Sequence, residues 1–282
     1  MLPIESEVEL LVVDNASTDK TREVVESHHS AFYSVRYVFE PNRGKGNAYN
    51  AGLREAIGEI CIFTDDDVVP SEVWLKSHLD AYQDSAVAAV QGAIELQFDT
   101  QPPPWLSSMH RDMLAEKLPG ELRIFPYNDG LVGANMSFRK SVANAAGPFS
   151  PILGPGRAGF WDESEFALRV KRLGLLTLFE PAARVKHLIS ASRLTVPYFA
   201  DAAFRQGVST YLAEELGAYT VTRRPVYRTL YVLARQIKVR IKSALKSEHY
   251  NMTSDYLLYR MHMGATWAWI VGFERLNRRY RV

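Results

Sequence analysis

Three consecutive carboxylates, Asp65, Asp66 and Asp67, follow the apolar segment 59–64 and precede Pro70. Neighbouring negative charges repel one another, and burying an ionised carboxylate without a partner is costly, so this segment must face water or a cation. In an extended segment alternate side chains point the same way, so we expect Asp65 and Asp67 to share one face. Such a pair suits Mg²⁺ or Mn²⁺, although a solvated acidic turn before a helix would explain the same residues.

Two basic residues, Arg43 and Lys45, lie in a glycine-rich segment that leads into an expected helix. Their charges, together with the N-terminus of that helix, could bind a phosphate group. A solvated basic turn is the alternative, because a short Gly-x-Gly sequence is weak evidence for a phosphate site.

The elements that must position these residues alternate between strands and helices. Apolar segments predict strands over 8–14, 34–40, 59–64 and 86–96, and helix-compatible segments predict helices over 15–29, 43–58 and 71–85. This alternation favours a mostly parallel sheet with helices on both faces, which binds ligands at the carboxyl ends of its strands. Asp14 and the three aspartates fall at such ends. A proline-rich segment then predicts a long loop with a short helix near 107–117.

The composition is that of a globular protein. The 282 residues are 47% hydrophobic, enough for one large domain or one domain with an appendage. The single cysteine, Cys61, lies in an apolar segment and excludes an internal disulfide, which suits a reducing compartment. No segment approaches the roughly 20 apolar residues of a membrane span, and the N-terminus lacks the pattern of a secretory signal, so we expect a cytoplasmic protein.

Charge is distributed unevenly along the chain. Residues 1–220 carry a net charge of −9, whereas residues 221–282, with 13 basic and 3 acidic side chains, carry +10. Apolar residues recur every three or four positions over 226–245, which predicts a basic amphipathic helix. The tail could lie on an anionic membrane surface near a lipid-linked acceptor, or its apolar stripe could pack on the rest of the protein. Nucleic-acid binding is not expected, because no recognition motif accompanies the charge.

Several ordered motifs between residues 8 and 190 resemble those of family 2 glycosyltransferases. They are "LLVVDNASTDKT", "NRGKGNAYNAGLREAIGEICIFTDDDVVP", "GANMSFRKS" and "GFWDESEFALRVKRLG", followed by "VKH". The resemblance implies the GT-A fold, a Rossmann-like, mostly parallel twisted sheet flanked by helices. It implies a catalytic domain over residues 1–190 and a basic helical extension over residues 191–282.

The resemblance also assigns roles to single residues. The donor nucleotide sugar would be bound by Asp14, Asn15, Arg43, Lys45, Asp65, Asp66, Gly133, Ala134 and Asn135. The metal would be held by Asp67, Asp65 and His187, although His187 could instead be an ordinary core or surface histidine. Glu163 corresponds to the usual base of the family, with Asp162 as the alternative because the order of the acidic pair is swapped here. Trp161 and Glu165 are assigned to the acceptor.

The reaction that the resemblance implies is inverting transfer of a sugar from a nucleotide-diphosphate donor, a UDP-sugar in the first instance, to an acceptor hydroxyl. Mn²⁺ or Mg²⁺ would stabilise the leaving diphosphate. The acceptor would be a cell-envelope polysaccharide, another glycan or a lipid-linked sugar, and the enzyme would be cytoplasmic or peripheral on the inner face of the membrane. The alternatives are a non-catalytic or truncated nucleotide-sugar-binding protein and a nucleotidyltransferase of similar fold.

Two features depart from the family pattern. Relatives normally begin with a strand ending in Pro-x-Tyr/Phe-Asn and a helix before the "VVDNAST" strand. We therefore expect either that the sequence is missing about 30 residues, or that the sheet lacks a strand beside the nucleotide pocket and the nucleotide site is incomplete. Tyr49 precedes Asn50 at a position where the family usually has an arginine, which weakens the expected contact with the nucleotide base.

Overall fold

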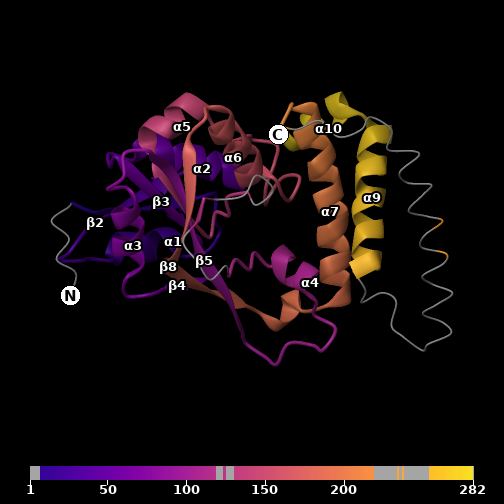
Figure 1. Cartoon of the computed structure of the whole chain (residues 1–282), viewed down its shortest axis with the longest axis horizontal. Helices are drawn as coiled ribbons and strands as arrows, with labels where there is room; N and C mark the ends of the chain where they lie inside the picture. Colours follow the sequence, from indigo (N-terminus) through magenta and orange to yellow (C-terminus); the bar gives the residue numbers. More distant parts are fainter. Residues whose placement is uncertain are drawn as a thin grey trace.

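The computed structural model describes residues 7–118, 123–124, 130–218, 234, 237 and 254–281. The strands and helices α1 to α6 form one body, and the long helices α7 and α9 stand side by side along its flank (Figure 1). The helices are α1 (Thr21–Ser27), α2 (Lys45–Glu55), α3 (Trp74–Ala81), α4 (Ser108–Met113), α5 (Lys140–Ala146), α6 (Asp162–Arg172), η1 (Ala191–Arg193), α7 (Val196–Glu215), α9 (Ser254–Val271) and α10 (Phe273–Arg281). The short helix expected near 107–117 is therefore confirmed as α4.

The first described strands form a small sheet of their own. Strand β1 (Glu9–Asp14) pairs in parallel with β2 (Ser34–Phe39), and α1 connects the two. Asp14 ends β1, as predicted. The expected lack of an earlier strand stays a prediction, because residues 1–6 lie outside the described part of the chain.

The main sheet is mixed, and the prediction of a mostly parallel sheet is wrong. Its strands lie in the order β3 (Ile60–Thr64), β7 (Asn135–Arg139), β5 (Val87–Phe98), β8 (Leu176–Ile189) and β4 (Val68–Pro70), with β6 (Arg123–Ile124) also paired to β8. Among the described pairings of this sheet, only β5 with β8 is parallel. Apolar strand sequences indicate that both faces are buried, but they do not indicate direction, which the long connections determine.

Strand register brings the three aspartates to the rest of the site. The segment 65–67 joins β3 to β4, and β4 pairs with β8 so that Val68 lies opposite His187. The backbone N–H of Leu188 donates to the Asp67 carbonyl at 2.8 Å, which holds the end of this segment against β8. On the other side, Thr64 lies opposite Asn135 at the start of β7.

Asn135 is fully buried and ties the sheet to α3. Its amide oxygen accepts from Trp74 Nε1 at 2.7 Å and lies 2.9 Å from His78 Nε2. Its NH₂ group donates to the carbonyls of Ala93 and Ala183 at 2.8 and 2.7 Å. Burial lowers the pKa of His78 to about 4, so the network contains a neutral imidazole. The side chain that we assigned to the donor is therefore saturated by structural hydrogen bonds.

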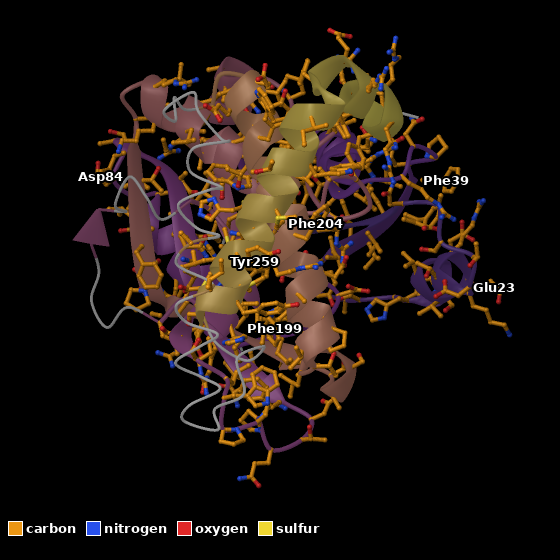
Figure 2. All side chains as sticks on the ribbon, turned by 90° about the vertical axis from the view of Figure 1, so that its right-hand side faces the viewer. Glu23, Phe39, Asp84, Phe199, Phe204 and Tyr259 are labelled. Atoms are coloured by element: carbon orange, nitrogen blue, oxygen red, sulfur yellow. The ribbon has the colours of Figure 1, made fainter. Side chains whose placement is uncertain are left out.

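Helices α7 and α9 approach each other through glycines. A Cβ atom on Gly207 of α7 would lie 1.8 Å from the Met261 carbonyl oxygen, and one on Gly264 of α9 would lie 1.9 Å from the Phe204 carbonyl oxygen. Figure 2 faces this helical layer and labels Phe199, Phe204 and Tyr259 on it. None of the described helices combines the length and apolar character of a membrane span. The helix predicted over 226–245 lies outside the described residues, apart from Ala234 and Ile237.

Gly207→Ala is expected to lower the free energy of unfolding by about 1–3 kcal/mol, because the added methyl group would force two helix backbones apart. Thermal denaturation followed by circular dichroism measures the change. Gly58→Ala is the matched control, since its Cβ would meet only the Ile60 carbonyl oxygen at 3.5 Å, and it should change stability by less than about 0.5 kcal/mol. Equal stability of the two variants would contradict the close helix contact.

Candidate active site

A cleft of about 1300 Å³ opens where the ends of β1, β3 and β8 meet the start of α6. It collects side chains from segments that are far apart in the sequence. The predicted site residues that line it are Asn15, Arg43, Lys45, Asp65, Asp66, Asp67, Ala134, Trp161, Asp162, Glu163 and His187. The structure therefore brings most of the predicted donor, metal and base residues to one cleft.

Four predicted site residues do not line the cleft. Asp14 accepts from the Tyr37 hydroxyl at 2.6 Å and from the Ser17 N–H at 2.8 Å, and the Tyr37 hydrogen bond lowers its pKa. Glu165 forms two hydrogen bonds with Arg169, at 2.7 and 2.8 Å. Asn135 is saturated as described above, and Gly133 offers its N–H to Glu163. These groups hold the site together, and the donor and acceptor contacts assigned to them have no support in the geometry.

The three aspartates do not form the extended pair that we predicted. Asp66 and Asp67 lie in a turn, so alternation no longer places Asp65 and Asp67 on one face. Asp65 Oδ1 lies 2.9 Å from Lys45 Nζ, whereas Asp67 Oδ2 lies 3.2 Å from His187 Nε2. The expectation failed because the strand turns at Asp66 to begin β4, a change of direction that local sequence does not specify. Asp65 is thus paired with a lysine, and Asp67 remains the metal ligand candidate.

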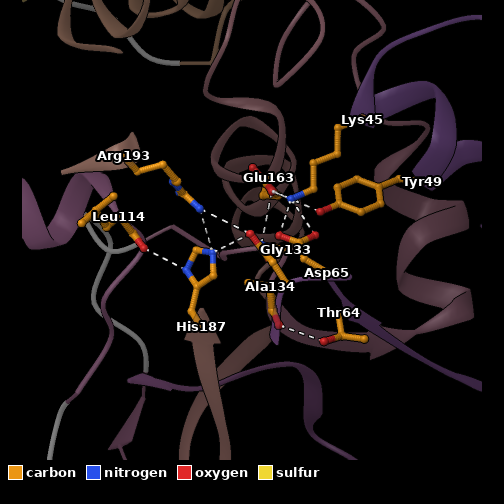
Figure 3. A network of polar contacts seen from close by, with 11 residues as sticks. Lys45, Tyr49, Thr64, Asp65, Leu114, Gly133, Ala134, Glu163, His187 and Arg193 are labelled. Atoms are coloured by element: carbon orange, nitrogen blue, oxygen red, sulfur yellow. Dashed lines mark hydrogen bonds and ion pairs between the residues drawn. The ribbon is translucent and has the colours of Figure 1, made fainter. Parts of the chain in front are cut away.

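Asp67 and His187 form the half of the cleft that fits a divalent metal. His187 is buried, and its Nδ1 lies 3.0 Å from the Leu114 carbonyl oxygen, to which it must donate (Figure 3). In its neutral form the ring therefore presents the Nε2 lone pair towards Asp67, as a metal-binding histidine does. Asp67 Oδ1 is buried and has no hydrogen-bond partner among the described residues. When the ring is instead protonated, Nε2 donates to Asp67 Oδ2, and this hydrogen bond lowers the pKa of Asp67, which keeps the carboxylate ionised.

The protein supplies few ligands at this position. Within the described ranges, no three His, Cys, Asp or Glu side chains gather as a ready ligand set. Mg²⁺ and Mn²⁺ sites that use substrate phosphates need only one or two protein carboxylates. Asp67 with His187 therefore fits a metal that is completed by a phosphate-bearing ligand.

Glu163 forms the centre of the other half of the cleft. Its Oε1 accepts from the Tyr49 hydroxyl at 3.2 Å and from the Gly133 N–H at 3.3 Å, and it lies 3.4 Å from Lys45 Nζ (Figure 3). Burial alone would raise the pKa of Glu163, but the Lys45 charge and the surrounding hydrogen bonds outweigh it and lower that pKa. Glu163 is therefore an ionised carboxylate with three fixed partners.

Asp162 differs from Glu163 in its hydrogen-bond partners and in the direction of its pKa shift. It is completely buried, and apart from the neighbouring Glu163 carboxylate neither of its oxygens has a hydrogen-bond partner among the described residues. Burial, followed by the negative charge of Glu163, raises the pKa of Asp162 well above its ordinary value. At neutral pH the pair therefore carries one proton, on Asp162, and Glu163 is the member that can accept another.

The backbone before this pair is held in an unusual conformation. Trp161 has a φ of 78° in the left-handed region, which is costly for a residue with a side chain. Its Nε1 donates to Thr210 Oγ1 at 3.0 Å, and the N–H of Phe160 donates to Ser209 Oγ at 3.1 Å. Helix α7 therefore anchors the segment that aims Glu163 into the cleft.

Sequence reasoning missed three contributors to this site. Tyr49 was noted only as a departure from a family pattern, and it proves to contact Glu163. Arg193 lies beyond the predicted domain boundary at residue 190, yet its Nη1 is 3.3 Å from Asp67 Oδ2. Leu114 contributes only a backbone carbonyl, so no side-chain pattern could have revealed it. The boundary itself stays a prediction.

Comparison with curated proteins relates the chain to glycosyltransferases. It is 28% identical over 157 residues to an uncharacterised glycosyltransferase of Nostoc sp., covering 52% of this chain and 46% of the relative. It is 31% identical over 94 residues to glycosyltransferase AglE of Haloferax volcanii, covering 33% of this chain and 31% of the relative. The chain thus matches less than half of the length of either relative.

Comparison with solved structures identifies the fold. The mannosyltransferase PcManGT from Pyrobaculum calidifontis, in complex with GDP-Man and Mn²⁺, matches with a TM-score of 0.60 at 18% identity, over 93% of this chain and 77% of that chain. The fold is therefore α/β and GT-A-like, with C-terminal helices. The model of the family described as Glycosyl transferase family 2 matches residues 4–146, which is half of the chain. The chain belongs to glycosyl transferase family 2.

Proposed function

We propose that this protein transfers a sugar from a nucleotide-diphosphate sugar to an acceptor hydroxyl, with inversion at the anomeric carbon. The observation that carries the proposal is that an ionised, positioned carboxylate, Glu163, and a metal-compatible pair, Asp67 and His187, line the same cleft. Family membership supports the reaction class, and the complex of PcManGT with GDP-Man and Mn²⁺ supports a nucleotide-sugar donor and a divalent metal.

In the proposed reaction Glu163 accepts the proton of the acceptor hydroxyl while the acceptor oxygen attacks the anomeric carbon. The bond from that carbon to the leaving diphosphate breaks on the opposite face, which inverts the configuration. A divalent metal bound by Asp67 and His187 would act as a Lewis acid on the leaving diphosphate. Lys45 keeps Glu163 ionised before the proton arrives and carries a positive charge into the cleft near the donor.

We assign the donor to the cleft-lining residues Asn15, Arg43, Lys45, Asp65, Asp66 and Ala134, and the acceptor to the side of the cleft lined by Trp161. Lys45 already forms an ion pair with Asp65, so the donor diphosphate competes with the Asp65 carboxylate for the Lys45 ammonium group. A UDP-sugar as the donor, a glycan or lipid-linked acceptor and a membrane-surface role for residues 221–282 stay predictions.

Asp67→Ala is expected to reduce donor turnover by about 100-fold or more, because it removes the charged ligand from the metal-compatible pair. The assay incubates the purified protein with Mn²⁺ and a panel of nucleotide sugars and measures release of the nucleoside diphosphate. The matched control is Glu72→Ala, which removes an exposed carboxylate that does not line the cleft and should change turnover by less than about tenfold. Equal turnover in the wild type and Asp67→Ala would rule out this site assignment.

A further inference from the structure

Arg193 places a positive charge on the residues that would hold the metal. Its Nη1 lies 3.3 Å from Asp67 Oδ2 and 3.3 Å from His187 Nε2 (Figure 3). It belongs to η1, the short helix between β8 and α7, and it lines the cleft with 26% of its side chain exposed. The positively charged guanidinium of Arg193 is thus already in contact with Asp67 and His187, the two residues that would bind the metal.

The other end of the Arg193 side chain is anchored. Nε donates to the Tyr198 hydroxyl at 3.1 Å, and the guanidinium lies 5.8 Å from the centre of the Tyr198 ring. Tyr198 lies in the first turn of α7, whose N-cap Thr195 accepts from the Tyr198 N–H at 3.3 Å. The anchor leaves Nη1 directed at Asp67, so the contact is built into the junction between the sheet and the C-terminal helices.

A divalent ion and Arg193 cannot use the same atoms of Asp67 and His187 without repelling each other. The guanidinium has another partner when the donor arrives, because a diphosphate is doubly or more negatively charged and its oxygens match the planar fork of arginine. We propose that Arg193 binds the diphosphate of the donor, and that Asp67 and His187 hold it in place until metal and diphosphate bind together. This inference rests on the proposed function, since it requires a diphosphate-bearing ligand in the cleft.

The inference predicts that removing Arg193 changes two affinities in opposite directions. Without its charge, Mn²⁺ alone should bind about threefold more tightly, because a competing cation has gone. At saturating Mn²⁺, UDP and GDP should bind about tenfold more weakly, because a charge-assisted hydrogen bond to the diphosphate has gone. A merely structural role for Arg193 would weaken both.

The experiment measures Mn²⁺ binding without nucleotide by electron paramagnetic resonance, and UDP and GDP binding at saturating Mn²⁺ by isothermal titration calorimetry. It uses the full chain as the wild type, Arg193→Ala and Arg193→Lys. Arg184→Ala is the control, because this exposed arginine of β8 pairs with Glu95 at 3.5 Å and does not line the cleft. Arg193→Lys keeps the charge but loses the fork, so it should bind Mn²⁺ as the wild type does and bind the nucleotides with intermediate affinity.

Opposite shifts in Arg193→Ala, with no shift in Arg184→Ala, support the inference. If the wild type binds UDP or GDP and Arg193→Ala binds them equally well, or if both its affinities fall, the inference is wrong and the proposed function stands. If the wild type binds neither nucleotide with Mn²⁺, the proposed function itself fails. Should Arg193→Ala not fold, unchanged nucleotide affinity in Arg193→Lys would overturn the inference.

Discussion

Glu163→Gln is expected to lower kcat by about 10²–10⁴-fold, because the amide cannot accept the proton of the acceptor hydroxyl. The substitution preserves shape, and Tyr49 and Gly133 can still donate to the remaining carbonyl oxygen. Binding of Mn²⁺ with UDP or GDP should therefore stay within about threefold of the wild type. Steady-state kinetics and calorimetry on the same preparations separate the lost chemical step from any loss of donor binding.

Asp162→Asn is the matched control for this prediction. Because Asp162 is buried and its raised pKa keeps it protonated, a neutral amide of the same size should cost less than about tenfold in kcat. The acid limb of the pH–rate profile should lie below the ordinary pKa of a glutamate side chain, about 4.3, because the pKa of Glu163 is lowered. A large loss in Asp162→Asn together with near-normal turnover in Glu163→Gln would show that the two roles are reversed.

Gly133→Ala is expected to reduce turnover by about 100-fold, because the segment before β7 has no room for a side chain. An added Cβ would lie 1.7 Å from the Tyr49 hydroxyl oxygen and 2.5 Å from Glu163 Oε1, so both groups must move. Displacing a catalytic carboxylate by about 1 Å can cost roughly 100-fold in rate. Turnover and thermal stability are measured together, since overpacking also costs about 1–3 kcal/mol of stability.

Two further variants test the cause of that loss. In Tyr49→Phe the hydroxyl is gone, so adding Gly133→Ala to this variant should do less damage than it does in the wild type. Gly52→Ala in helix α2 is the control. Its Cβ would lie at an ordinary contact distance, 3.4 Å, from Val13 Cγ2, so the substitution should leave turnover within about twofold. Strict additivity of Tyr49→Phe and Gly133→Ala would mean that the two residues do not share this contact.

The cleft brings together several residues that the sequence singled out, whereas others lie outside it. Strand-end residues such as Asp67 and His187 were identifiable, because an apolar segment that ends in polar residues marks the edge of a sheet. Asn135 and Glu165 also lie within the quoted family motifs, but their polar atoms form hydrogen bonds inside the protein. Motif membership alone could not separate the two groups, since both kinds of residue are polar and stand at element ends.

The antiparallel pairing of β4 with β8 affects the positions of Asp65 and Asp67, and the local sequence does not specify this pairing. The chain turns at Asp66 and runs antiparallel to β8, and this turn separates Asp65 from Asp67 and places Asp67 against His187. An extended continuation of β3 through residues 65–67 would have kept the two aspartates on one face. The pairing partner of a three-residue strand is decided by tertiary packing rather than by its own sequence.

The sequence by itself determined the family, the strand-end carboxylates, the acidic pair at the start of α6 and the charge difference between the two parts of the chain, because these are properties of residue order. Only the tertiary structure distinguished the two acids of that pair, and their different surroundings support the proposal that Glu163 is the base. Both acids stand at the same helix end. They differ because Asp162 is buried with Glu163 as its one hydrogen-bond partner among the described residues, whereas Glu163 also meets Lys45, Tyr49 and Gly133. The pKa of a carboxyl group depends on such neighbours, and they come together only when distant segments fold onto one another.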